Sequence, residues 1–470
     1  MNAVRLTANS MADTFDVVVI GAGPAGENVA AQAAKGGLSV ALVESSLAGG
    51  ECSYWACMPS KALLVPGDTL ALAQKTPGLR VDAKLDVQAV FRHRSAMTHD
   101  YDDASQVKWI DSANVKLVRA HARFTGPRRL SVTDTSGAVR ELEATKAVVL
   151  ATGTRAAIPN IPGLPESGAW TNHEGTGSKE VPRRLLVLGG GPVAVELAQA
   201  WRSLGSESVT LIERGERLLS RMEPFASEMV RASLEMLGVQ IRTKTALKSV
   251  RKQGTTFVAT LEPGGEVQAD RLLIATGRDF NTNDMGVETL GLTAGKPISV
   301  DDQCRAKDVA GGWLYAVGDV NGRNLLTHMG KYQARIAGRA ILGEKDTAWA
   351  DERAVTQVVF SNPQVASVGW TEAEAKKRGC SVKVITVNME DTAGLALQGE
   401  ALKGKVQIVL DTARNVLLGA TFVGPGVGDM LHAATIAVVA EVPLSVLVHA
   451  VPCFPTVSEF WRNLLLRAEV

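Results

Sequence analysis

One arrangement of residues constrains the fold of this chain more than any other, and it occurs twice. In the first copy, the apolar run from Val17 to Ile20 leads directly into Gly21-x-Gly23-x-x-Gly26. An alanine-rich helical stretch and a second apolar run follow the glycines. A continuous β-branched run is typical of a strand buried in a parallel sheet. Strand, glycine loop, helix and second strand together predict the start of a doubly wound α/β sheet.

The glycine spacing also indicates a ligand. Gly21 permits a tight turn, Gly23 lets a pyrophosphate approach the backbone, and Gly26 lets the helix pack closely on the strand. The N-terminus of the helix offers unpaired N–H groups to the phosphates. Glu44 ends the second strand, where a carboxylate accepts hydrogen bonds from a ribose. We therefore predict a dinucleotide site, although glycines that serve packing alone are the alternative.

The second copy lies in the middle of the chain. A strand from Leu185 to Leu188 meets Gly189-x-Gly191-x-x-Ala194, and the next strand ends in Glu213. Two dinucleotide sites with different loops are most simply explained by FAD and a nicotinamide, because hydride passes between these two cofactors.

The residues after the second strand bear on the choice of nicotinamide. Glu213 favours the free ribose hydroxyls of NAD and repels a 2′-phosphate. Arg214 and Arg217 lie close by and are able to pair with such a phosphate. We expect NAD(P)H, with NAD favoured over NADP.

Several further loops match a flavin and nicotinamide protein. Asp319 lies at the end of an expected strand, and we predict that it accepts a hydrogen bond from the ribityl chain of a flavin. The alternative is that it is an ordinary turn aspartate. Two similar loops, 151-ATGT-154 and 275-ATGR-278, suggest crossovers between two nucleotide domains. The remaining predicted cofactor contacts are Gly50, Thr152, Gly153, Gly277 and Gly318.

Composition excludes several classes of protein. The 470 residues carry a formal net charge of +1, which gives no electrostatic reason to expect nucleic acid or an anionic membrane as a partner. No apolar run reaches the roughly 18 residues that span a bilayer. The N-terminal residues 1–16 lack the apolar core of a signal peptide. We therefore expect a cytoplasmic protein with a small-molecule partner.

The stretch 49-GGECSYWACMPSK-61 contains a close cysteine pair. In a regular helix, residues five apart have Cα atoms about 8.5 Å apart, which exceeds the roughly 4.4–6.8 Å of a disulfide. Cys52 and Cys57 are therefore able to bridge only if the chain bends between them and a helix starts near Cys57, with Pro59 in its first turn. Zinc usually requires closer pairs and two further ligands, so we expect no metal site. Two inert cysteines are the remaining alternative.

Two dinucleotide folds with C-x₄-C-x-P-S-K after the first resemble the flavoprotein disulfide reductases, a class I pyridine nucleotide-disulfide oxidoreductase family. The resemblance runs from about Asp16 to the C-terminus, and the segments 360-FSNPQVASVGWTEAEA-375 and 418-LGATFVGPGVGDMLH-432 resemble the dimerisation domain of that family. It implies an α/β fold with two Rossmann-like dinucleotide-binding domains and an α+β C-terminal dimerisation domain. The predicted bounds are 1–155 and 286–350 for the FAD domain, 156–285 for the NAD(P) domain and 351–470 for the dimerisation domain.

The resemblance also implies roles for individual residues. NAD(P)H reduces FAD, Cys57 faces the flavin and forms a thiolate–flavin charge-transfer complex, and Cys52 exchanges with the substrate. Lys61 reaches the flavin and pairs with Glu196. The helix that starts near Thr327 stabilises negative charge on the reduced ring. The family forms homodimers that share their sites across the interface.

The C-terminal segment departs from the family. In the family, a catalytic His-Pro-Thr segment is followed by a Glu. In this chain, Phe454 occupies the position of the histidine, and Glu459 occupies the position of the Glu. The ketopropyl-coenzyme M carboxylating reductase also has Phe at this position. His449 and Cys453 are candidate substitutes for the missing base. The loop residues Tyr54 and Trp55 are bulkier than usual, and they are predicted to line an apolar cleft or to pack beneath the flavin.

Thiol–disulfide exchange needs an acid/base, which phenylalanine does not provide. The leading prediction is therefore an FAD- and NAD(P)H-dependent oxidoreductase with a non-standard acceptor, such as a quinone, a small electrophile or an unusual thioether or disulfide. One alternative is a reductase resembling dihydrolipoamide dehydrogenase that uses another base. The other alternative is a non-enzymatic flavoprotein redox sensor.

Overall fold

The structure is a computed structural model that describes residues 12–468. The chain forms two compact units, and each is built from three separate segments. Unit 1 comprises residues 1–54, 99–155 and 278–348. Unit 2 comprises residues 55–98, 156–277 and 349–470.

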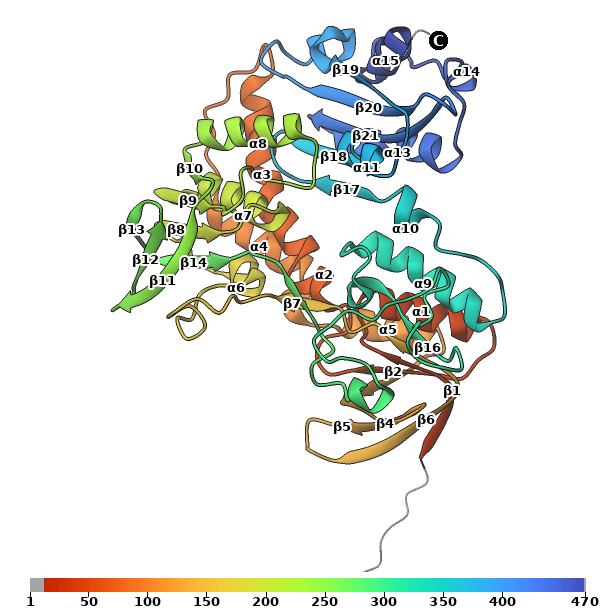
Figure 1. Ribbon diagram of the computed structural model, residues 1–470. Helices are drawn as coiled ribbons and strands as arrows, with labels where there is room; N and C mark the ends of the chain where they lie inside the picture. The colour runs from red at the N-terminus through yellow and green to blue at the C-terminus, as the bar shows by residue number, and fades with distance from the viewer. Residues whose placement is uncertain (1–11, 469–470) are drawn as a thin grey trace, which may run out of the picture. The chain divides into compact units, whose positions relative to one another are not determined.

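Unit 1 is organised around a seven-stranded sheet with the order β3-β2-β1-β6-β5-β4, in which β16 pairs with β6 off this path (Figure 1). Strands β1, β2, β3, β6 and β16 pair in parallel, whereas β4 and β5 form antiparallel pairs. The strands are β1 (Asp13–Ile20), β2 (Val40–Glu44), β3 (Lys116–Arg119), β4 (His121–Gly126), β5 (Arg129–Thr133), β6 (Val139–Leu150) and β16 (Leu314–Ala316).

The alternation of side chains along β1 divides the core of unit 1 into two layers. Val17 and Val19 pack with the helices on one face, and Val18 and Ile20 pack with the hairpin β4–β5 and residues 285–320 on the other. Each such aliphatic side chain contributes roughly 1.5–3 kcal/mol when fully buried. The helices of the first face are α1 (Pro24–Lys35), α5 (Ala104–Ser112) and α9 (Thr327–Ile341).

Unit 2 contains a second parallel sheet with the order β10-β9-β8-β14. One face packs on helices, and the other packs on the antiparallel sheet β11-β12-β13. The strands are β8 (Arg184–Leu188), β9 (Ser208–Ile212), β10 (Val239–Arg242), β11 (Ala246–Gln253), β12 (Thr256–Glu262), β13 (Gly265–Ala269) and β14 (Arg271–Ile274). The helices are α3 (Cys57–Lys75), α4 (Val87–Met97), α6 (Asn172–Gly177), α7 (Pro192–Ser203) and α8 (Pro224–Met236).

Residues 55–98 pack with the second sheet rather than with the first. Leu63 and Leu64 of α3 and Phe91 of α4 share one core with Trp201 of α7. The predicted domain bounds place these residues in the FAD domain. Grouping by packing is a different criterion, so those bounds stay a prediction.

The C-terminal part of unit 2 is a five-stranded antiparallel sheet with the order β17-β18-β21-β20-β19. Helices α13 and α15 pack on one face through Leu431, Phe460 and Trp461. The observed sheets agree with the predicted class, two doubly wound folds and an α+β part. The elements are β17 (Thr356–Val359), β18 (Gln364–Gly369), β19 (Val382–Asn388), β20 (Lys405–Asp411), β21 (Val416–Gly424), α10 (Ala350–Arg353), α11 (Glu372–Lys377), α12 (Ala393–Ala396), α13 (Val427–Val439), α14 (Leu444–Leu447) and α15 (Phe460–Ala468).

Candidate active site

In the first glycine loop, between β1 and α1, backbone atoms crowd Gly21 and Gly26 but leave space around Gly23. Gly21 has φ of +99°, and a Cβ added there would lie 2.5 Å from the carbonyl oxygen of Ala151. A Cβ on Gly26 would lie 1.8 Å from the oxygen of Gly21. For Gly23, in contrast, the nearest atom is Cα of Gly50 at 4.0 Å. The loop therefore leaves open space where a pyrophosphate is expected to lie.

The polar groups around this loop also fit a dinucleotide. No side chain caps α1 at its N-cap residue Gly23, so the N–H groups of the first turn are open to an anion. The carboxylate of Glu44 accepts hydrogen bonds from the N–H groups of Ala22 and Ser46, both at 2.7 Å, which orient it. Among the described residues, Oγ1 of Thr152 is buried without a hydrogen-bond partner. A bound ligand is expected to supply that partner.

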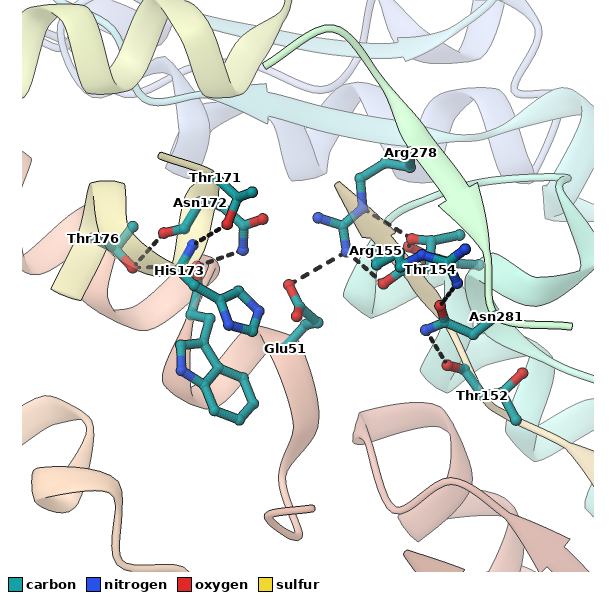
Figure 2. A network of polar contacts seen from close by, with 12 residues as sticks. Glu51, Thr152, Thr154, Arg155, Thr171, Asn172, His173, Thr176, Arg278 and Asn281 are labelled. Carbon is teal, nitrogen blue, oxygen red and sulfur yellow. Dashed lines mark hydrogen bonds and ion pairs between the residues drawn. The ribbon is translucent and has the colours of Figure 1, made fainter. Parts of the chain in front are cut away.

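A charged network lies beside this loop in unit 1 (Figure 2). The guanidinium of Arg278 contacts the carboxylate of Glu51 at 3.3 Å and donates to both oxygens of Thr154, at 2.9 and 2.7 Å. Oγ1 of Thr154 donates in turn to Asp319 at 2.7 Å. Burial raises the pKa of Asp319 above its usual value. Asp319 is thus oriented by the hydroxyl of Thr154.

Glu51 and Arg278 were missed by the sequence reasoning. Their positions carry a signal, because Glu51 directly precedes Cys52 and Arg278 directly follows Gly277. These positions mark each residue as a candidate for the site. The two are 227 residues apart in sequence, so the chain alone does not indicate the pairing.

The close cysteine pair is carried by two consecutive helices. Cys52 lies in the short helix α2 (Gly50–Tyr54), and Cys57 is the first residue of α3. Ala56, between them, has φ of −132° and ψ of −92°, which is not helical. The predictions that the chain bends between the cysteines and that a helix begins near Cys57 are confirmed. Pro59 lies in the first turn of α3, where a missing N–H costs nothing.

Lys61 and Glu196 form the ion pair that the resemblance implies. Nζ of Lys61 lies 2.7 Å from Oε2 of Glu196. The other oxygen of Glu196 accepts from the N–H of Phe360 at 2.9 Å, and the ammonium lies 4.8 Å from the centre of the Phe360 ring. The Glu196 side chain is only 6% exposed, and both of its oxygens have a partner inside the protein, as a buried charge requires. The Lys61 side chain is 30% exposed and has access to a ligand.

Helix α6 fixes the loop between the cysteines (Figure 2). The carbonyl oxygen of Trp55 accepts from Nδ2 of Asn172 at 2.9 Å and from Oγ1 of Thr176 at 3.3 Å. The Trp55 ring stacks on His173, with centroids 4.6 Å apart and planes 3° apart. Tyr54 is buried. The three α6 residues were missed, because nothing in the segment TNHEGT marks it as the partner of a loop more than 100 residues earlier.

The second glycine loop resembles the first in geometry. A Cβ on Gly189 would lie 2.3 Å from the oxygen of Ala275, whereas a Cβ on Gly191 would meet no atom of residues 12–468 within 4 Å. Glu213 accepts from the N–H of Gly215 at 2.6 Å. The guanidinium of Arg217 donates to two backbone carbonyls, at 2.8 and 2.7 Å, and is held within its own loop.

The C-terminal segment exposes the residue in place of the histidine. Phe454 is 77% exposed, and Cys453 next to it is also exposed. Glu459 ends the short helix η5 (Val457–Glu459), and its Oε2 is buried with no hydrogen-bond partner among the described residues. His449 lies two residues past the end of α14.

Three further findings concern residues 12–468. Helix α9 begins at Thr327, as predicted from the sequence. None of the helices in this range is both long and apolar enough to cross a membrane. Over the same range, no group of three or more His, Cys, Asp and Glu side chains has the arrangement of a metal site.

Known families match almost the whole chain. Residues 15–337 match the pyridine nucleotide-disulphide oxidoreductase family, and residues 355–465 match the dimerisation domain of pyridine nucleotide-disulphide oxidoreductases.

Individual relatives agree with these matches. The chain is 31% identical to a mercuric reductase of Staphylococcus aureus, over 90% of this chain and 77% of the relative. It is 33% identical to a dihydrolipoyl dehydrogenase of Chlorobaculum tepidum, over 97% of both chains. Among solved structures, the Cu(II) complex of the HOCl-induced flavoprotein disulfide reductase RclA from Escherichia coli has a TM-score of 0.84 at 24% identity, over 97% of this chain and 99% of that one. This last similarity concerns the fold alone.

Proposed function

Because the chain belongs to the pyridine nucleotide-disulphide oxidoreductase family, we propose that it passes hydride equivalents from NADH to a Cys52–Cys57 disulfide and on to an acceptor that needs no imidazole acid. Members of this family are FAD-dependent enzymes, which sets aside the alternative of a non-enzymatic sensor. With a quinone as the acceptor, NADH, one proton and the quinone give NAD⁺ and the hydroquinone. The disulfide is reduced and re-formed once in each cycle.

FAD, when bound, accepts hydride from the nicotinamide and delivers two electrons to the disulfide. When FAD is bound, the glycine loop before α1 would hold its pyrophosphate, Glu44 would bind its ribose, and Asp319 would bind its ribityl chain. Cys57 at the start of α3 is placed to become a thiolate, because a helix N-terminus lowers the pKa of a thiol. Lys61 supplies positive charge near the reacting atoms, and Glu196 fixes the position of that charge.

The second glycine loop is proposed to hold the nicotinamide cofactor, with NAD favoured over NADP. Support comes from Glu213, whose carboxylate disfavours a 2′-phosphate. Further support comes from Arg217, whose hydrogen bonds to Met222 and Ser220 keep it from such a phosphate. Arg214 is exposed and makes the weaker case for NADP.

The observation that carries the proposal of a non-standard acceptor is the pair Phe454 and Glu459. Phe454 provides no proton, and the carboxylate oxygen that an imidazole would contact lacks a hydrogen-bond partner in the described chain. The family's dimerisation domain supports a homodimer. We infer that each subunit presents this segment to the Cys52 of its partner, and that Cys453 stands beside Phe454 there.

Dihydrolipoyl dehydrogenase activity is the second candidate, and the 33% identity over 97% of both chains favours it. This candidate requires that another group, such as His449, replaces the missing histidine. A mercuric ion is a third acceptor to test, because a relative is named for its reduction. A cytoplasmic location stays a prediction from the sequence.

The test compares NADH-dependent turnover of lipoamide, of a quinone and of mercuric ion on one preparation. We expect quinone or mercuric ion turnover to exceed lipoamide turnover by at least an order of magnitude, because acid–base catalysis contributes about 10²–10⁴-fold to such reactions. Fast lipoamide turnover would rule out the leading proposal.

Cys57→Ser should abolish acceptor turnover and the long-wavelength absorbance of the reduced enzyme, yet NADH should still bleach its flavin. Cys380→Ser serves as the control.

A further inference from the structure

A second polar connection joins α3 to α7 beside the Lys61–Glu196 pair. Asp68 lies seven residues after Lys61, and Gln199 lies three residues after Glu196, so each pair shares one face of its helix. Nε2 of Gln199 donates to Oδ1 of Asp68 at 2.9 Å. The two helices are thus linked by one ion pair and by one amide–carboxylate hydrogen bond.

The same backbone turn completes both connections. The N–H of Phe360 donates to Glu196 at 2.9 Å, and the N–H of Asn362 donates to Oε1 of Gln199 at 2.8 Å. The Asn362 side chain also hydrogen-bonds to Asp68. The turn that joins β17 to β18 therefore connects the two carboxylates through three polar contacts of its own.

A glycine makes the second connection possible. A Cβ on Gly67 would lie 3.1 Å from Cβ of Ser203 on α7, which is tighter than ordinary packing. The short side chain of Asp68 reaches Gln199 because the two helices approach this closely.

This cluster contains two carboxylates but one cation. Lys61 pairs with Glu196, and no ion pair joins Asp68 to a cation within the described residues. Burial raises the pKa of Asp68 to about 7, the Asn362 hydrogen bond opposes this shift, and the charge of Glu196 adds to it. Helices α4, α6 and α7 pack against α3, and among their charged groups Glu196 is the one that contributes. Asp68 therefore gains or loses a proton in the working pH range of an enzyme.

We propose that Asp68 is a positioning residue for the hydride-transfer half-reaction, acting through Glu196 and the Phe360–Asn362 turn to set the charge around Lys61. This inference rests on the proposed function, because it requires Lys61 to lie near the reacting atoms. When Asp68 is protonated, the cluster has no net charge. When it ionises, the cluster carries one negative charge, which opposes the arrival of electrons nearby.

The experiment measures the rate of flavin bleaching by NADH in the FAD-loaded dimer, without oxygen and without an acceptor, between pH 5.5 and 8.5. In the wild type we expect a fall of roughly three- to tenfold centred near pH 7, the size that a coupling of up to one pKa unit gives. Asp68→Asn should hold the rate at its acid value throughout. Gln199→Leu should keep the step but move it to higher pH, because it removes a hydrogen bond to the carboxylate.

The exposed Asp82→Asn, on the loop after α3, provides the matched control and should follow the wild type. FAD content and circular dichroism verify that each variant is folded, and Asp68→Glu should restore a step if Asp68→Asn folds poorly. A step that persists in Asp68→Asn, or is absent from the wild type, overturns the inference while leaving the proposed function intact. A wild type that NADH does not bleach at all overturns both.

Discussion

Two carboxyl groups have pKa values that burial raises to about 7, Glu27 on α1 and Asp68 on α3. Unfolded carboxyls titrate near 4, so the folded chain binds these protons more tightly between about pH 4 and 7. The free energy of unfolding should therefore fall as pH rises through this window and level off above pH 7. Glu27→Gln should reduce the fall in the free energy of unfolding between pH 5 and pH 8 by about 1–3 kcal/mol. Urea unfolding at pH 5 and pH 8 measures it, and an unchanged slope would contradict this.

At Phe454 the prediction concerns activity. Phe454→His should restore an acid/base beside Glu459 and raise NADH–lipoamide turnover about 10- to 100-fold. Phe454→Leu is the matched control and should give no gain. Adding Glu459→Gln to Phe454→His should remove most of the gain, because the imidazole loses its orienting carboxylate. A gain that survives this second change would argue against a His–Glu pair.

At the scale of the elements, the two glycine loops make a sharp prediction. A Cβ on Gly191 would meet no atom of the described chain within 4 Å, so Gly191→Ala should fold normally. It places a methyl group where the nicotinamide pyrophosphate is expected to approach, and should raise KM for NADH about tenfold or more with FAD content unchanged. Gly126→Ala, which is equally free of clashes, is the control. A normal KM would show that this loop does not hold the cofactor.

The same elements show what a sequence predicts and what it does not. Strands β1 and β8 and their glycine loops were predictable because consecutive residues determine them. The bend before Cys57 followed from helix geometry once the two cysteines were taken as a bridging pair. The hydrogen bonds from α6 to the Trp55 carbonyl and the Glu51–Arg278 pair were not predictable, because each joins segments more than 100 residues apart. Asp68 was missed because an aspartate in a helix is normally expected to face solvent. Its burial becomes evident only once its neighbours on other segments, such as Gln199, are known.

At the scale of the whole molecule, the dimerisation domain leaves apolar side chains exposed in one protomer. Ile436 and Val439 on α13 are 55% and 47% exposed. Ile436→Asp should weaken the dimer by about 100-fold or more, because a buried unpaired charge is costly. Light scattering measures the mass, and acceptor turnover should fall while NADH still bleaches the flavin. The exposed Met236→Asp on α8 is the control, and a dimer unaffected by Ile436→Asp would place the interface elsewhere.

Neither unit is a continuous stretch of the chain, and this affects how the protein is made. The chain passes between the units after residues 54, 98, 155, 277 and 348. During synthesis, β1 and β6 are complete long before β16, which pairs with β6, and α9, which packs on α1. The nascent first sheet therefore waits with an open strand edge and an uncovered apolar face, which is the kind of surface that aggregates. After β6 ends at Leu150, the ribosome must add 166 residues to complete β16 at Ala316 and 191 to complete α9 at Ile341.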